Sequence, residues 1–195
     1  QNFYNTGNTL LNRYIAKGED KDLQDAQYYL QQAIEIFQNI GNQQLEVEAR
    51  NAAGVAALYS HSFPEAKKEL KQSLDIYEQL QDSTGLLNAY YNLATLAETE
   101  GKNKEAVLAL KNLVDLLKKV GDSSDYQFVR EQFSDSQGKL SITLIENKIN
   151  NLLERVRNER NEQFMLVSFS IFSTLIIGGF FYYRQKMSAQ RALAT

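Results

Sequence analysis

Residues 66–82 read AKKELKQSLDIYEQLQD, and a similar apolar pattern stands 40 positions earlier, in AQYYLQQAIEIFQNIGN (residues 26–42), and 40 positions later, in AVLALKNLVDLLKKVGD (residues 106–122). Most of the shared apolar positions lie three or four residues apart, which places them on one face of a helix. They are Ala26, Leu30, Ile34, Ile36, Phe37 and Ile40, then Ala66, Leu70, Leu74, Ile76, Tyr77 and Leu80, then Ala106, Leu110, Val114, Leu116, Leu117 and Val120. The pattern predicts three similar helices, each with an apolar face that needs a partner.

A partner helix is predicted before each of these stretches, over roughly residues 44–61 in the second unit and 85–100 in the third. Small residues such as Gly54 recur in the partner helices and allow two helices to approach closely. Between the two helices of the second unit, Ser62 and Glu65 have the spacing of a capping box, in which each side chain satisfies a free amide at a helix start. Each unit is therefore expected to be a helical hairpin.

These hairpins resemble the tetratricopeptide repeat, with a period of 40 residues in place of the family's usual length of about 34. The matching residues are Leu10, Leu11, Tyr14, Gly18, Leu23, Ala26, Leu30 and Ala33, then Ala53, Gly54, Phe63, Ala66, Leu70 and Ser73, then Tyr90, Leu93, Ala94, Gly101, Ala106 and Leu110. The first unit departs by about three extra residues in the turn around residues 18–22. The resemblance implies an all-α solenoid of three hairpins over residues 1–122, capped by a degenerate helix over residues 123–138. A helical bundle without true repeats is the alternative.

Residues 164–183 read FMLVSFSIFSTLIIGGFFYY and contain no charged side chain. This is the length that a helix needs to cross about 30 Å of hydrocarbon, so a single transmembrane helix is predicted, followed by a short basic tail over residues 184–195. Four basic residues precede the stretch closely and three follow it, so the positive-inside rule does not decide its orientation.

Residues 139–163 are predicted to form a connecting helix with a heptad seam that continues into small residues of the membrane segment. The proposed helix-dimer face comprises Ile142, Ile145, Ile149, Leu152, Val156, Ser170, Thr174 and Gly178. A homodimer through this face is one interpretation. An amphipathic helix that folds back onto the repeats is the other.

Composition argues against several classes of function. The net charge of −3 disfavours nucleic-acid binding, which needs basic residues to neutralise phosphates. The chain has no cysteine and a single histidine, His61, which is expected in a turn where the repeat family commonly has glycine. No nucleotide-binding or hydrolase motif is present. We therefore expect no catalytic site, no cofactor and no metal site in this chain.

The family resemblance implies a concave groove lined by the first helix of each hairpin, with a protein or peptide as its partner. The groove residues carried over are Asn8, Asn12, Asn51, Val55, Tyr59, Asn88, Tyr91 and Thr95, with Ile15, Glu48, Leu58 and Glu98 beside them. Asparagine can pair with a peptide backbone, and tyrosine adds rigid contact area. The alternative is a merely solvated face. Family members that clamp a carboxylate use lysine and arginine here, whereas this chain has Tyr91 and Thr95 in the last repeat.

Three hypotheses for function follow. The first is the extracytoplasmic sensory part of a signalling receptor of the bacterial inner membrane. Its order of parts resembles that of bacterial sensor kinases, and an output domain is then expected beyond Thr195. The second is a tail-anchored scaffold that recruits partners to a membrane, and the third is an accessory subunit of a larger membrane complex. The start at Gln1 is compatible with a fragment or with a processed chain.

Overall fold

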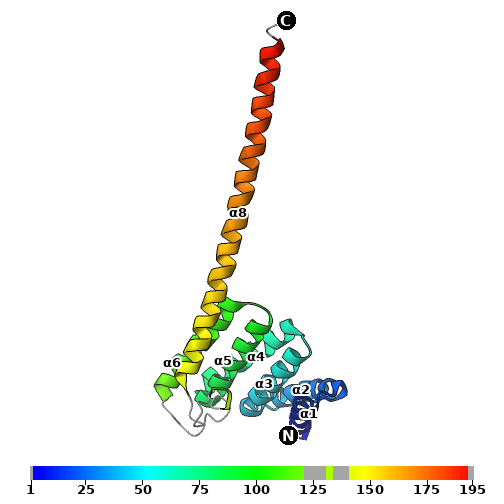
Figure 1. The fold of residues 1–195 in the computed structure, drawn as a ribbon. Helices are drawn as coiled ribbons and strands as arrows, with labels where there is room; N and C mark the ends of the chain where they lie inside the picture. The colour runs from blue at the N-terminus through cyan, green and yellow to red at the C-terminus, as the bar shows by residue number, and fades with distance from the viewer. Residues whose placement is uncertain (1, 121–130, 134–140, 193–195) are drawn as a thin grey trace. The chain divides into compact units, whose positions relative to one another are not determined.

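A computed structural model describes residues 2–120, 131–133 and 141–192, and for residues 180 and 182–192 it describes the backbone alone. The main elements are α1 (Asn2–Lys17), α2 (Asp20–Asn39), α3 (Gln43–Tyr59), α4 (Phe63–Leu80), α5 (Ser83–Thr99), α6 (Asn103–Val120) and α8 (Ile142–Ala192) (Figure 1). The chain divides into two compact units, Gln1–Leu153 and Glu154–Thr195, which are considered separately below. The prediction of an all-α protein is confirmed for the described ranges.

In the first unit, called the hairpin domain below, six helices pack in sequence as antiparallel neighbours. α1 packs on α2, α3 on α4 and α5 on α6, while α2 contacts α3 and α4 contacts α5. The first helices also touch one another, α1 with α3 and α3 with α5. The alanine and leucine positions that recur every 40 residues are fully buried: Ala26, Leu30, Ala66, Leu70, Ala106 and Leu110. The helical hairpins predicted from the repeat are therefore present.

Two of the expected core positions differ from the prediction. Ile36 is 38% exposed and Ile40 is 65% exposed. At 3.6 residues per turn these positions lie about 120° and about 80° around α2 from the fully buried Leu30. They are thus outside the narrow stripe that faces the core, although they share the 40-residue spacing.

Left-handed residues end the first helix of each hairpin. Gly18, His61 and Gly101 follow α1, α3 and α5 with φ angles of 75°, 57° and 71°. Glycine is the residue that adopts this conformation at little cost, and it is common at helix C-termini. The expectation that His61 occupies a turn position typical of glycine is confirmed, and its side chain is exposed.

In the first and second hairpins, a glycine of the first helix packs closely against a leucine of the second helix. A Cβ atom added to Gly54 would lie 2.6 Å from Cγ of Leu70, and one added to Gly7 would lie 2.8 Å from Cγ of Leu30. Both distances are shorter than side chains tolerate, so only glycine fits at the present separation. These two contacts are equivalent points in the first and second hairpins.

Measured from these equivalent points, the first hairpin is longer than the second. Gly7 precedes the turn residue Gly18 by 11 positions, whereas Gly54 precedes His61 by seven. Only Gly18 and Glu19 lie between α1 and α2. The prediction of extra residues in the turn around residues 18–22 is therefore wrong, because the additional residues continue the helices.

The starts of α3 and α5 are capped by side chains. The side chains of Asn42 and Asp82 each accept a hydrogen bond from the backbone N–H three residues later, at 3.1 and 3.0 Å. The capping box predicted at Ser62 is not formed, since Ser62 makes no side-chain hydrogen bond to the start of α4. Its hydroxyl instead accepts a hydrogen bond from the Ser60 hydroxyl at 3.2 Å. In the turn between α3 and α4, the two serine hydroxyls therefore bond to each other, and Ser62 does not cap α4.

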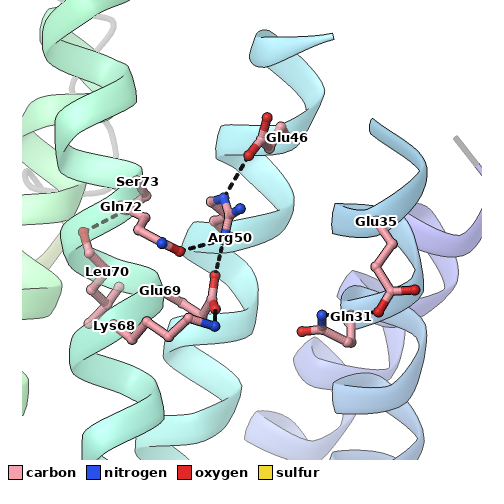
Figure 2. A network of polar contacts seen from close by, with 9 residues as sticks. All are labelled: Gln31, Glu35, Glu46, Arg50, Lys68, Glu69, Leu70, Gln72 and Ser73. Carbon is pink, nitrogen blue, oxygen red and sulfur yellow. Dashed lines mark hydrogen bonds and ion pairs between the residues drawn. The ribbon is translucent and has the colours of Figure 1, made fainter. Parts of the chain in front are cut away.

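A buried ion-pair cluster joins α3 to α4 (Figure 2). Nη1 of Arg50 donates to Glu69 Oε2 at 2.5 Å and to Gln72 Oε1 at 2.6 Å, while its Nε donates to Glu46 at 2.8 Å. Lys68 approaches the other oxygen of Glu69 at 2.8 Å. Arg50 and Glu69 are only 6% and 2% exposed, and charges buried to this extent need such partners. The cluster therefore holds α3 against α4 through charged side chains.

The beginning of α8 belongs to the hairpin domain. Ile145, Ile149 and Leu152 are 0%, 7% and 2% exposed and share an apolar cluster with Leu113 and Leu117 of α6. The ion pair between Lys118 and Glu146, at 3.3 Å, joins the same two helices. The connecting helix predicted over residues 139–163 therefore begins by packing on the last hairpin.

The capping helix predicted over residues 123–138 lies mostly outside the described residues. Of this segment, residues 131–133 are described. Phe133 is 6% exposed and joins the cluster formed by α5, α6 and the beginning of α8. At this position, an apolar side chain covers the end of the hairpin core.

In the second unit, α8 contains the long apolar segment, residues 164–183, and exposes most of the side chains that the structure describes there. Phe164, Leu166 and Phe169 are 73%, 70% and 72% exposed. By length and composition one helix of the described chain, Ile142–Gly179, could cross a membrane, with a mean hydropathy of 1.4 in its most apolar window and none of that window buried. The hydroxyls of Ser173 and Thr174 donate to backbone carbonyls one turn earlier, at 2.8 and 2.9 Å, so both are satisfied within the helix.

Candidate functional site

A groove of about 800 Å³ runs along the first helices of the three hairpins. All eight residues predicted for a concave groove line it: Asn8, Asn12, Asn51, Val55, Tyr59, Asn88, Tyr91 and Thr95. Ile15, Glu48 and Leu58 line it as well, whereas Glu98 does not. The contacts of α3 with α1 and with α5 explain this arrangement, because they bring one face of each of the three helices together.

Asparagine amides lie along the groove on all three helices. The Nδ2 group of Asn92 on α5 donates to Oδ1 of Asn51 on α3 at 3.0 Å, so these amides bridge two hairpins. This bond also fixes the orientation of the Asn51 amide. Asn8 and Asn88 are half-buried and Asn12 is exposed, which leaves donors and acceptors facing the groove. The wall is thus able to pair with the alternating N–H and C=O groups of an extended chain.

Five tyrosines contribute the aromatic part of the lining: Tyr4, Tyr14, Tyr59, Tyr77 and Tyr91. The rings of Tyr14 and Tyr59 meet edge to face, with centroids 5.7 Å apart. Tyr77 comes from the second helix of its hairpin, α4, and its ring passes under Gly85, where an added Cβ would lie 2.1 Å from Cδ1. Tyrosine combines a rigid apolar ring with a polar tip, which suits binding of a peptide.

The charge of the groove comes from one carboxylate. Among the described residues that line it, Glu48 is the only acidic side chain, and no lysine or arginine is present. Burial raises the pKa of Tyr4, and the nearby carboxylate of Glu48 raises that pKa further. Burial also raises the pKa of Tyr77, with added effects of Asp82 and Glu48. Both phenols therefore stay protonated at neutral pH and remain hydrogen-bond donors.

Several lining residues were missed by sequence reasoning. Asn92 follows Tyr91 directly on α5, so a wider helical face would have included it. Tyr77 could not be found in this way, because the 40-residue spacing places it with Phe37 and Leu117 on the apolar face of the second helices. Gln132 lies in the segment predicted as a cap, and Tyr91 donates a hydrogen bond from its phenol to Gln132 Oε1 at 3.1 Å.

The residues of the predicted helix-dimer face fall into two groups. Ile142, Ile145, Ile149 and Leu152 pack in the hairpin domain, as the alternative interpretation of this seam expects. Val156 is half-buried, and Ser170, Thr174 and Gly178 are exposed on the second unit. A Cβ atom added to Gly178 would meet nothing within 4 Å. Self-association through the small residues stays a prediction.

The described residues contain no group of three histidine, aspartate or glutamate side chains placed to hold a metal ion. The groove offers amides, phenols, one carboxylate and apolar surface, which is an arrangement for binding. No protein-family model matches the chain, and no curated protein matches it either.

Proposed function

We propose that this chain is a membrane-anchored, tetratricopeptide-type sensory module that binds an extended peptide segment in its groove. The groove of about 800 Å³, lined by the first helices of three successive hairpins, is the observation that carries the proposal. The apolar segment of α8 supports the anchor, because it exposes phenylalanine and leucine side chains over a length sufficient to cross a bilayer.

Recognition of a peptide backbone follows from the amides. Asn51 and Asn92 form a fixed pair between α3 and α5, and Asn12 and Asn88 lie on the same surface. Each amide carries both an acceptor and two donors, as an extended backbone requires. A peptide that loses its hydration in the groove would therefore find replacement hydrogen bonds, which limits the desolvation penalty.

A chain of contacts joins the groove to the beginning of α8. Tyr91 lines the groove and meets Phe133 edge to face, with centroids 5.7 Å apart. The Nζ atom of Lys148 on α8 lies 5.9 Å from the centroid of the same Phe133 ring and 2.8 Å from Glu98 of α5. A ligand that moves Tyr91 would therefore change the packing around the beginning of α8. This linkage favours a sensor over a passive scaffold.

In the proposed arrangement the hairpin domain lies outside the cytoplasm of a bacterial cell, and α8 carries the response into the inner membrane. Proteolysis of the hairpin domain in sealed vesicles of known orientation tests this side. Cleavage only in right-side-out vesicles supports a receptor. Cleavage only in inverted vesicles would instead support a scaffold that faces the cytosol.

The binding function is tested with the full chain in lipid nanodiscs, probed on an array of short random peptides. We expect a set of binding peptides, and we expect Asn12→Ala with Asn88→Ala to weaken all of them. Gln24→Ala with Asn39→Ala, at two exposed positions of α2, is the matched control and should bind as the unmodified chain does. Absence of any binding peptide would contradict the proposal.

Transmission is tested by hydrogen exchange over residues 142–153 with and without a peptide from this array. Binding should slow exchange there, because a peptide that orders Tyr91 also orders Phe133 and the helix packed beside it. In Phe133→Ala the peptide should still bind while this protection is lost. Equal exchange with and without peptide in the unmodified chain would leave binding in place but contradict a sensory role.

A further inference from the structure

The electrostatic character of the groove differs from that of the surfaces around it. Elsewhere in the hairpin domain, acidic side chains pair with basic ones. An example is Lys67 Nζ, which lies 2.7 Å from Glu105 Oε2. The described lining of the groove, in contrast, contains Glu48 as its only acidic side chain and lacks lysine and arginine. An ion without a counter-ion in a partly enclosed groove favours a ligand of the opposite charge.

The nearest basic residue of the same helix cannot supply that counter-ion. Arg50 is two positions from Glu48, so the two side chains point to different faces of α3. Its guanidinium is bound to Glu46, Glu69 and Gln72 (Figure 2), and Arg50 and Glu69 are both buried. Releasing it would leave the buried Glu69 with the exposed Lys68 as its remaining partner, which is costly. Glu48 thus keeps its negative charge available to the groove.

The surroundings of Glu48 suit a cation. Its carboxylate is half-buried near the phenol of Tyr4, whose pKa it raises, and an ionised carboxylate has about four acceptor positions for the donors of a ligand. The phenol rings of Tyr4 and Tyr77 line the same groove, and aromatic faces attract guanidinium and ammonium groups. Residues 1–122 carry 17 acidic and 12 basic side chains, which adds a long-range attraction for positive ligands.

We propose that the groove selects extended peptides that present an arginine or lysine side chain to Glu48. The inference rests on the proposed peptide-binding function and names the class of partner. The asparagine amides hold the backbone, and the carboxylate with its neighbouring phenols reads one basic side chain. This selectivity is opposite in sign to that of a groove that clamps a peptide carboxylate with basic residues.

The test uses the full chain in nanodiscs on peptide libraries that are random except for one fixed residue, which is arginine, lysine, alanine or glutamate. Arginine and lysine libraries should bind about tenfold more tightly than the alanine library, and added salt should reduce the difference. In Glu48→Gln the preference should disappear while binding to the alanine library persists. Glu48→Lys should shift the preference to the glutamate library.

The matched control is Glu35→Gln, which changes the net charge equally at an exposed position of α2 outside the groove lining. It should keep the preference for basic residues. Circular dichroism melting of each variant establishes that it is folded. Equal binding of all four libraries by the unmodified chain, or an unchanged preference in Glu48→Gln, would overturn this inference and leave peptide binding intact. Failure of the unmodified chain to bind any of the four libraries would overturn both proposals.

Discussion

The hairpin domain and the apolar segment of α8 use the same residue types in opposite ways. Leu70 and Leu110 are fully buried between helices, whereas Leu166 and Leu175 are 70% and 68% exposed. Burying a leucine side chain contributes about 1.5–3 kcal/mol, so each exposed one in the segment forgoes that gain in water. The hairpin domain therefore obtains its apolar contacts from itself, whereas the exposed side chains of the apolar segment lack such contacts within the described residues, as the proposed membrane span requires.

The largest expected effect is the loss of stability on truncation of one buried leucine in the hairpin domain. Leu70→Ala should lower the free energy of unfolding of the hairpin domain by about 2–5 kcal/mol, because it opens a cavity between α3 and α4. Leu108→Ala, at a leucine that is 61% exposed, is the control and should cost less than about 1 kcal/mol. Urea titrations of the full chain in nanodiscs, followed by circular dichroism, measure both.

An equal change in the second region should leave that titration unmoved. Leu166→Ala removes no packing partner within the chain, so the urea midpoint of the hairpin domain should not shift. A midpoint lowered as far as in Leu70→Ala would mean that the apolar segment is part of the same folded core.

A charged residue should impair membrane insertion when it stands in the apolar segment but not when it stands in the hairpin domain. Leu175→Arg is expected to oppose membrane insertion by about 2.5–3.5 kcal/mol, the cost of arginine near the centre of a spanning helix. The fraction of chain that resists carbonate extraction should fall accordingly. Leu108→Arg, in the hairpin domain, should extract as the unmodified chain does. Equal retention of Leu175→Arg and the unmodified chain would argue against a span.

Two glycines offer a smaller contrast. Gly54→Ala places a Cβ 2.6 Å from Cγ of Leu70, so the helices must move apart and about 1–3 kcal/mol of stability should be lost. Gly178→Ala meets open space and should leave the unfolding of the hairpin domain unchanged. Urea midpoints decide this pair. Greater stability of Gly54→Ala would show that the two helices are not tightly packed there.

The smallest effect concerns pH. The Arg13 guanidinium, which pairs with Asp22, lowers the pKa of that carboxyl. Its contribution to stability is present above the ordinary aspartate pKa of about 3.9 and is lost as the pH falls through the lower folded value. In Arg13→Ala the guanidinium no longer lowers this pKa, so the variant should be less stable at neutral pH and the difference between the two proteins should shrink as the pH falls through this range. Thermal melts from neutral pH down through this range measure the difference, and coincident curves for both proteins would contradict it.

The sequence was sufficient to predict the helical hairpins, and the family resemblance supplied eight of the residues that line the groove. The 40-residue spacing places Leu30, Leu70 and Leu110 at equivalent buried positions. These are local consequences of a repeated pattern, so they do not depend on contacts between distant parts of the chain.

Features that depend on alternative partners could not be read in this way. Ser62 has the capping spacing, yet its hydroxyl pairs with Ser60 because the turn brings the two side chains together. The seam containing Ile145 fits a second copy or a neighbouring helix equally well by periodicity. The structure places it on α6, where Leu113 and Leu117 form part of its apolar cluster.

The proposed separation of the chain into a water-exposed groove and a lipid-embedded segment is tested most directly by spin labels. The sequence has no cysteine, so single variants such as Tyr59→Cys in the groove and Phe169→Cys or Ile176→Cys in the segment carry one label each. In liposomes, the labels at 169 and 176 should be relaxed by oxygen and shielded from a water-soluble nickel complex, and the label at 59 should show the reverse. Strong relaxation by nickel at all three positions would contradict the account.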